Sequence, residues 1–214
     1  MVKMNSHADI YTEELNSLTQ LILASGSPRR KELLESMGLK FDILITNTDE
    51  DTIQQEGIGV DLYVQELALM KAADAAKLLI KNKNAMIISA DTVVTLDDEI
   101  LGKPKDKTDA FLMLRKLSGK EHKVYTGVCV MRVNDGKTFC SSLSTTVKFK
   151  ELSNEKIAAY IETLEPLDKA GAYGIQGKGS MIVEYINGDY NNVVGLSTSL
   201  LADILENEFD YKIF

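Results

Sequence analysis

Cysteine, histidine and long apolar stretches are scarce in this 214-residue chain, and each scarcity excludes a class of protein. No apolar run approaches the roughly 20 residues that a membrane-spanning helix requires. The first 20 residues lack the hydrophobic core of a signal peptide, so we expect a cytoplasmic protein. The two histidines, His7 and His122, have no partner at catalytic spacing, and no Ser/His/Asp set is visible, which disfavours covalent nucleophilic catalysis.

The only two cysteines, Cys129 and Cys140, flank the turn Asn134-Asp135-Gly136. This turn predicts a hairpin, so the two cysteines lie near one another on facing strands. Their spacing does not match a metal-binding motif, and a disulfide is not expected in a reducing compartment. We therefore expect two buried or half-buried thiols.

The charge balance is acidic, with 32 acidic and 24 basic residues and a net charge of −8. This balance argues against nucleic acid as a partner, because binding a phosphate backbone requires a broad basic face. A local basic island in such a chain fits a small, highly charged ligand better.

Apolar patterns of strand and helix type alternate along the chain, and neither an internal repeat nor a flexible linker is visible. We expect a short helical extension over residues 1–19 and one α/β domain over 20–214, with a mixed twisted sheet and flanking helices. We predict strands over residues 21–24, 39–46, 85–96, 124–133, 138–149 and 181–186. We predict a first helix that begins at Pro28 and four further helices over 60–80, 108–118, 153–163 and 198–208.

Two adjacent arginines stand at the predicted start of the first helix of the domain. Ser27 is the expected N-cap and Pro28 the first helical residue, which places Arg29 and Arg30 in the first turn. A cation in the first turn is repelled by the positive end of the helix dipole, which costs about 0.3–1 kcal/mol for each charge. An anion bound by free N–H groups, Ser25, Ser27 and the guanidinium groups would offset this cost. The alternative is two solvated arginines on a surface helix.

Asp91 interrupts an otherwise apolar strand, and Lys71 lies on the apolar face of the predicted helix 60–80. A buried charge needs a partner, so either a cleft opens at Asp91 or a cation meets its carboxylate. The alternatives are an aspartate bound to a backbone amide at the strand end and a lysine whose ammonium reaches solvent.

Two loops add further charge. Lys103 lies between Gly102 and Pro104, which fix the chain direction, and lysine serves as a point charge for phosphate. Glu50 lies in an acidic loop with Asp49 and Asp51, the latter two of which we expect to be solvated. Glu50 together with Asp91 would suit Mg²⁺, which takes one or two protein carboxylates and completes its shell with water and phosphate.

Four glycines punctuate residues 168–179, a density that lets the backbone approach a ligand closely. Gln176 in this segment could bind a base edge through its amide. The pattern is neither the Rossmann fingerprint nor a P-loop, and a plain turn-rich connection is the alternative.

Taken in order, these segments resemble the Maf family of nucleotide pyrophosphatases over nearly the whole chain, from Leu21 to about Leu205. The resemblance rests on six motifs in register, namely SGSPRRKELL from Ser25, SADT from Ser89, GKP from Gly102, GKEHKVYTG from Gly119, EPLDKAGAYGIQG from Glu165 and GDYNNVVGL from Gly188. Two departures are visible: Ser197 replaces the usual proline after Gly-Leu, and about twenty residues precede the first strand.

The resemblance implies a two-lobed, cleft-bearing mixed sheet shared with the inosine triphosphatase group. It also implies a homodimer and hydrolysis of a nucleoside triphosphate to the monophosphate and pyrophosphate, dependent on Mg²⁺ or Mn²⁺. The family's functional positions fall on Arg30, Glu50, Lys71, Asp91 and Lys103, with Asp91 as proton acceptor. Because a carboxylate so close to cations is a weak base, we expect Asp91 chiefly to orient water and to hold metal.

Arg29, Thr92 and Gln176 match the family branch that acts on dTTP and UTP. The alternatives are a pyrophosphatase for 7-methyl-GTP or another modified nucleotide, and a non-catalytic nucleotide-binding regulator of cell division. A regulator has no need of an aspartate in an apolar strand, so the enzyme is the favoured hypothesis.

Overall fold

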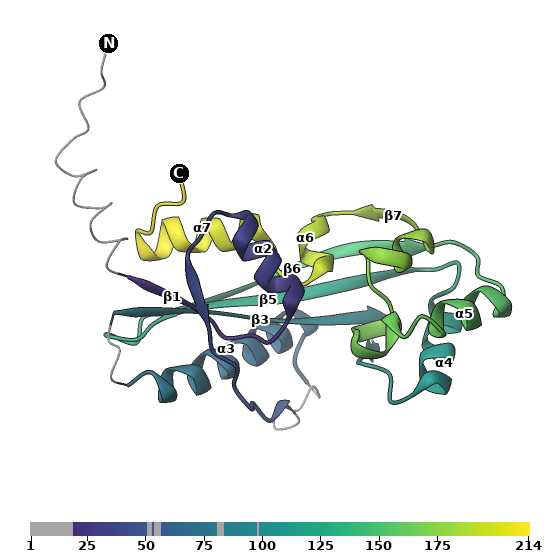
Figure 1. Cartoon of the computed structure of the whole chain (residues 1–214), viewed down its shortest axis with the longest axis horizontal. Coiled ribbons are helices and arrows are strands. Elements are labelled where there is room, and N and C mark those ends of the chain that lie inside the picture. Colours follow the sequence, from purple (N-terminus) through teal and green to yellow (C-terminus); the bar gives the residue numbers. More distant parts are fainter. Residues whose placement is uncertain (1–18, 51–52, 54–56, 81–83, 98) are drawn as a thin grey trace, which may run out of the picture.

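The structure is a computed structural model that describes residues 19–50, 53, 57–80, 84–97 and 99–214. Its frame is a single sheet with helices on both faces, so the predicted mixed α/β architecture is confirmed (Figure 1). The predicted N-terminal helical extension lies outside the described residues apart from Thr19, as do His7 and Asp51.

Seven strands form the sheet among the described residues: β1 (Gln20–Leu23), β2 (Phe41–Ile43), β3 (Ala85–Leu96), β4 (Glu99–Leu101), β5 (Glu121–Arg132), β6 (Thr138–Phe149) and β7 (Val183–Asn187). They lie in the order β2-β1-β3-β5-β6-β7, and β4 pairs with β3 beside this path. β1 is parallel to β2 and β3, whereas β3, β5, β6 and β7 are antiparallel in turn. The sheet is therefore mixed, with its long hairpin in the middle.

The helices are α2 (Pro28–Ser36), α3 (Val60–Leu78), α4 (Lys107–Leu117), α5 (Asn154–Ile161), α6 (Tyr190–Val194) and α7 (Thr198–Phe209), with short 3-10 segments η2 (Glu165–Asp168), η3 (Ala170–Ala172) and η4 (Gly177–Met181). Figure 1 shows α3 on one face of the sheet and α2 and α7 on the other. α4 and α5 gather at the far end of the long strands, so the two ends of the sheet carry different helical layers.

The apolar core follows this division. One cluster of buried side chains joins β1, β3 and β5 to α2 and α7, and a second joins β1, β3 and β5 to α3. A third cluster surrounds Phe149 at the far end, between the sheet, α4 and α5. Ser153 caps the start of α5 by accepting a hydrogen bond from the Lys156 amide, and Leu152 and Ile157 lie in the same cluster as a hydrophobic staple.

α3 packs closely on the sheet because small residues face each other. Ala68, Ala72 and Ala75 are fully buried, and Ser89 of β3 donates to the Ala68 carbonyl oxygen at 2.6 Å. At Gly127 of β5, an added Cβ would lie 2.2 Å from the carbonyl oxygen of Val64. A residue without a side chain is therefore required where the helix backbone crosses β5.

Two predictions from apolar patterns are wrong. The strand expected over residues 39–46 is only the three-residue edge strand β2, and both Ile43 and the nearby Ile45 are exposed. Leu78, which follows the apolar spacing of the predicted helix 60–80, is exposed at the last residue of α3. The periodicity of the sequence does not show where covering elements end.

The prediction of two free thiols is also wrong. The β5–β6 register places Cys129 directly opposite Cys140, and the structure joins the two as a disulfide, with the Cα atoms 4.1 Å apart. The turn alone suggested proximity, but only the register makes the residues direct partners. Within the described ranges, none of the helices combines the length and hydropathy that a bilayer crossing requires.

Candidate active site

A pocket of about 830 Å³ lies between the start of α2, the middle of β3, and the glycine-rich segment that runs from η2 to η4. Its volume is within the range of small-molecule sites, which span roughly 300–1,000 Å³. All the residues singled out from the sequence line it: Ser25, Ser27, Arg29, Arg30, Glu50, Lys71, Asp91, Thr92, Lys103 and Gln176. The tertiary fold thus brings together side chains from distant parts of the chain.

The pocket begins at the N-terminus of α2, where Pro28 is the first helical residue as predicted. Ser27 occupies the N-cap position, but its side chain makes no capping hydrogen bond. Instead, Ser25 Oγ accepts a hydrogen bond from the Ser27 amide at 3.2 Å. The first turn holds no acidic residue, so its N–H groups and positive dipole end face the pocket without an anion from the helix itself.

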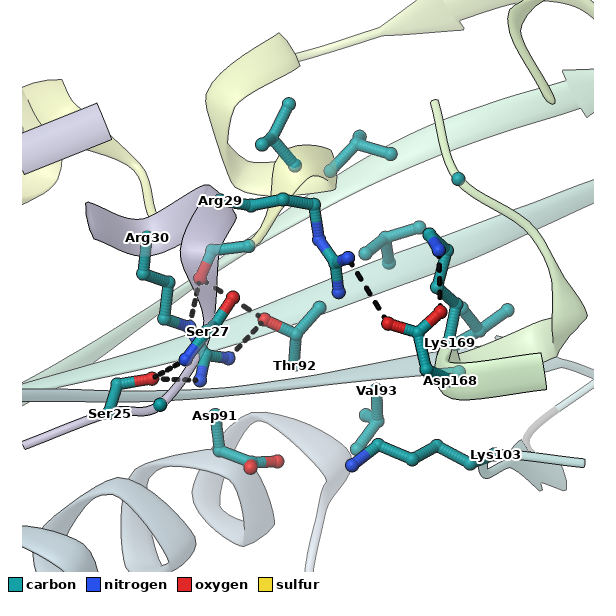
Figure 2. A pocket seen from close by; sticks show the side chains of 18 of the residues that line it. Ser25, Ser27, Arg29, Arg30, Asp91, Thr92, Val93, Lys103, Asp168 and Lys169 are labelled. Atoms are coloured by element: carbon teal, nitrogen blue, oxygen red, sulfur yellow. Dashed lines mark hydrogen bonds and ion pairs between the residues drawn. The ribbon is translucent and has the colours of Figure 1, made fainter. Parts of the chain in front are cut away.

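Arg30 is fixed by three hydrogen bonds. Its Nε donates to the Gly195 carbonyl oxygen at 2.8 Å, Nη2 to Thr92 Oγ1 at 3.1 Å, and Nη1 to Ser25 Oγ at 3.4 Å (Figure 2). Burial lowers the pKa of Arg30, and the nearby Asp91 carboxylate partly offsets this effect. A cation held without an adjoining carboxylate bond keeps charge available for an anionic ligand.

Arg29 takes the opposite direction from its neighbour. Figure 2 shows its side chain extending across the pocket toward η2, where Nη1 lies 3.5 Å from Asp168 Oδ2. Successive helical residues diverge by about 100°, since a turn holds 3.6 residues. The two arginines therefore serve different ends of the pocket.

The Lys71 ammonium joins the two carboxylates of the site. Lys71 Nζ donates to Asp91 Oδ1 at 2.5 Å and lies 2.8 Å from Glu50 Oε1. The Lys71 and Asp91 side chains are only 14% and 11% exposed, so both charges are largely removed from water. The cation that Asp91 was expected to meet is thus Lys71, whose stem packs inward on α3 as its helical face predicted.

Glu50 lies on the open side of this group and remains ionised. Burial raises the pKa of Glu50, but the Lys71 hydrogen bond and the charges of Lys71, Lys103 and Arg30 outweigh it and leave the pKa below its usual value. Lys103 itself is exposed at the pocket wall. Its charge faces the same carboxylate although the two residues lie on different loops.

Thr92 acts within the protein. Its Oγ1 contacts Arg30 Nη2, Thr126 Oγ1 at 2.9 Å and the Gly195 carbonyl oxygen at 3.3 Å. A direct contact between Thr92 and a substrate base would involve a hydroxyl that these three protein groups already engage. In this structure Thr92 positions Arg30.

The glycine-rich segment is held in place by Glu165. The Glu165 carboxylate accepts hydrogen bonds from the Tyr160 hydroxyl at 2.8 Å and from the amides of Lys178 and Gly179 at 3.0 Å each. These bonds bracket the exposed Gln176, which lines the pocket opposite α2. Glu165 thus tethers the glycine-rich segment beside the pocket.

Several residues of the site carried no assigned role in the sequence analysis. The Gly195 carbonyl oxygen and Thr126 support Arg30 and Thr92, Asp168 faces Arg29, and Glu165 holds the glycine-rich segment. Each lies in one of the motifs that carried the family resemblance, and this was the available signal. Ser197, the departure from the family pattern, caps α7 by accepting from the Leu200 amide and donates to Asp189 Oδ2 at 2.5 Å.

The pocket is polarised. Arg30, Lys71, Lys103 and the α2 N-terminus supply positive charge around the Asp91–Glu50 pair, while Arg29, Asp168 and Gln176 offer hydrogen-bonding groups at the other end of the pocket. No cluster of three or more potential metal-ligating His, Cys, Asp or Glu side chains occurs in the part of the chain that the structure describes. A ligand with a polyanionic end and a hydrogen-bonding end matches this arrangement.

Known proteins are similar in sequence to this chain over most of its length. Residues 20–208 match the family described as Maf-like protein. A dTTP/UTP pyrophosphatase of Thermoanaerobacter sp. (strain X514) is 46% identical over 194 residues, covering 91% of this chain and 99% of that protein. A dTTP/UTP pyrophosphatase of Clostridium botulinum (strain Alaska E43 / Type E3) is 50% identical over 187 residues, covering 87% and 98%. The Ham1 protein of Staphylococcus aureus aligns with a TM-score of 0.44 at 16% identity, over 78% of this chain and 81% of that one.

Proposed function

The chain belongs to the Maf family, and on that premise we propose that it hydrolyses dTTP and UTP to the monophosphate and pyrophosphate. The observation that carries this proposal is the polarised pocket, in which three cations from separate segments surround a pair of carboxylates. Removal of non-standard or surplus pyrimidine triphosphates is the house-cleaning role that such an activity serves.

The cationic end binds the triphosphate. A triphosphate carries about four negative charges, and a protein of net charge −8 must offset them locally. Arg30 presents a fixed guanidinium, Lys103 a flexible ammonium, and the first turn of α2 its free N–H groups. These donors face the pocket together, so the phosphates lie along the wall between α2 and Lys103.

The carboxylate pair suits a divalent cation. Glu50 and Asp91 each use one oxygen for Lys71, and no described residue donates a hydrogen bond to Glu50 Oε2 or Asp91 Oδ2. The oxygens left free in this way are hard donors of the kind that Mg²⁺ or Mn²⁺ takes from a protein, with phosphate oxygens and water in the remaining positions. Such an ion, held by Glu50 and Asp91, would neutralise phosphate charge and favour departure of pyrophosphate.

Asp91 directs the hydrolytic water. Its carboxylate, fixed by Lys71 on the rigid strand β3, orients a water toward the α-phosphorus and accepts its hydrogen bond. The water oxygen bonds to phosphorus as the bond to the bridging oxygen of pyrophosphate breaks, and the water proton passes to the carboxylate or to solvent. Arg30 and Lys103 stabilise the charge that develops on pyrophosphate.

The hydrogen-bonding end selects the base. Arg29 and Gln176 reach the pocket from opposite walls, and both offer donors to the carbonyl groups of uracil or thymine. Thr92 contributes by fixing Arg30. A site built on such hydrogen bonds rejects bases that leave its polar groups unpaired.

The test is a panel of triphosphates assayed for pyrophosphate release with Mg²⁺ or Mn²⁺. We expect dTTP and UTP to be strongly preferred over ATP. Equal rates on all common triphosphates would overturn the assigned substrate, a preference for 7-methyl-GTP would assign the chain to the other branch, and binding without turnover would support a regulator.

We further propose that the protein is cytoplasmic and forms a homodimer. Light scattering after size-exclusion chromatography measures the molar mass and so tests the dimer.

A further inference from the structure

The ion pair between Arg29 and Asp168 links two walls of the pocket, on the side toward which Arg29 turns away from Arg30 (Figure 2). Arg29 belongs to α2 and Asp168 to η2, and both side chains line the pocket, 31% and 67% exposed. The Arg29 Nη1 to Asp168 Oδ2 distance of 3.5 Å brings a donor fork and an acceptor next to one another (Figure 2). Neither Asp168 nor this pairing has a role in the mechanism above.

Asp168 is held in position from behind. Lys169 Nζ donates to Asp168 Oδ1 at 2.6 Å and also to the Glu165 carbonyl oxygen at 2.6 Å. Burial raises the pKa of Asp168, but the Lys169 hydrogen bond and the charges of Lys169 and Arg29 outweigh it and leave the pKa below its usual value. Asp168 is therefore an ionised carboxylate near neutral pH, able only to accept hydrogen bonds.

A carboxylate in a pocket for a polyanion needs a reason, because it repels phosphate. The repulsion is tolerable only at the end that receives the uncharged part of the ligand. At that end, a fixed acceptor beside a fixed donor is complementary to a ligand edge that presents a donor next to an acceptor. Uracil and thymine present this edge, with N3–H between two carbonyl oxygens.

We propose that Asp168 accepts the N3–H of uracil or thymine while Arg29 donates to the adjoining carbonyl oxygen, which makes Asp168 a specificity-determining residue. This inference rests on the proposed function and deepens it. Held in the position that suits uracil, cytosine turns the lone pair of its unprotonated N3 toward the carboxylate, and its amino donor and N3 acceptor fit the pair only after a shift along the edge. Adenine lacks a donor at the equivalent ring nitrogen. Guanine carries an N1–H, so its exclusion falls to other features of the pocket.

N3-methyl-UTP, which lacks only the relevant N–H, is the direct probe. We expect the wild-type chain to prefer UTP over N3-methyl-UTP by roughly 10- to 100-fold in kcat/KM, the usual strength of a hydrogen bond to a charged group. In Asp168→Ala this preference should largely disappear, because the acceptor is gone. A residue that merely supported the fold would lower both rates together and leave their ratio unchanged.

Asp168→Asn provides a second, nearly isosteric variant. Its amide can donate to cytosine N3, so the CTP to UTP ratio of kcat/KM should rise at least several-fold. Glu162→Gln is the matched control, since Glu162 is an exposed carboxylate near the same region, paired with Lys107 and absent from the pocket lining. This control should keep both ratios at their wild-type values.

The outcomes separate the inference from the function on which it rests. If the wild-type chain hydrolyses UTP but Asp168→Ala keeps its full discrimination against N3-methyl-UTP, the role of Asp168 is wrong and the proposed function stands. If no triphosphate is hydrolysed, the proposed function fails, and dissociation constants for the two nucleotides, measured by calorimetry in the wild-type chain and in Asp168→Ala, still decide whether the N3–H is recognised. Equal discrimination in both chains would overturn the inference.

Discussion

Lys71 Nζ lies 2.5 Å from Asp91 Oδ1, and this contact joins α3 to the central strand at the floor of the pocket. The same ammonium reaches Glu50, so one positive charge keeps two carboxylates together. Packing, charge compensation and the geometry of the site therefore depend on one side chain.

Replacement of Lys71 by methionine should reduce both stability and turnover. The substitution leaves Asp91 buried without its counter-charge, which typically costs about 3–5 kcal/mol. We expect the rate of pyrophosphate release to fall at least 100-fold and the midpoint of urea unfolding to shift to a clearly lower urea concentration. Lys77→Met on the same helix is the control, because the exposed Lys77–Asp74 pair should contribute less than about 1 kcal/mol. Similar losses in both variants would contradict the role of Lys71.

Arg30→Lys tests the need for a guanidinium fork. A lysine cannot reach the Gly195 carbonyl oxygen, Thr92 and Ser25 at once, so the positive charge is retained without its orientation. We expect kcat/KM for UTP to fall about 100-fold, a loss of about 2.7 kcal/mol in transition-state stabilisation. Steady-state kinetics measure it, and Arg132→Lys, at an exposed pair with Asp135, should be neutral. Wild-type kinetics in Arg30→Lys would show that charge alone suffices.

Asp91→Asn should separate binding from chemistry. The amide keeps the shape of the side chain but loses the negative charge that orients water, so turnover should be abolished while the triphosphate still binds. Calorimetric titration with UTP together with the pyrophosphate assay checks both halves. Near-normal turnover would remove Asp91 from the mechanism.

His122 makes stability depend on pH. It is buried among Phe149 and Tyr173 and contacts the Tyr173 hydroxyl at 2.8 Å, and burial lowers its pKa from 6.5 to about 4. The unfolded chain binds the His122 proton more tightly than the folded chain does. The contribution of the neutral, buried His122 to the free energy of unfolding is therefore complete above pH 6.5 and is lost as the pH falls toward 4. The loss amounts to about 3 kcal/mol.

The matched measurement is urea unfolding of the wild type and His122→Gln at pH 7 and pH 4.5. Glutamine does not titrate in this range, so the wild type should lose the larger share of its unfolding free energy on acidification. An identical pH dependence in the two chains would contradict a neutral, buried imidazole.

Gly127→Ala should push α3 away from the sheet. The new Cβ would meet the Val64 carbonyl oxygen at 2.2 Å, and backbone cannot yield as a side chain does. Overpacking of this kind costs about 1–3 kcal/mol, and we expect reduced turnover as well because α3 carries Lys71. Gly102→Ala serves as the control for stability alone, since an added Cβ there meets nothing within 4 Å. Equal unfolding midpoints in the two variants would be inconsistent with the close approach.

Local sequence patterns predicted most of the elements. The apolar run of β3, the Asn-Asp-Gly turn between β5 and β6, and the helix start at Pro28 lie close to their expected places, because short-range hydrogen bonding and periodicity act within a few residues. The short elements β4 and α6 escaped prediction: β4 is a three-residue strand paired across a tight turn with the end of β3, and α6 contacts the distant strands β5 and β6.

The sequence by itself determined that a basic island, an isolated acid and a helical lysine exist, and the order of its motifs indicated the family. Only the tertiary structure decided which charges meet: Lys71 with Asp91 and Glu50, Arg30 with the Gly195 carbonyl oxygen and Thr92, and Arg29 with Asp168. It also decided that Cys129 and Cys140 are direct partners. The reason is that local pattern reports the preference of the backbone, whereas the pairing of charges depends on crossings between segments far apart in the chain.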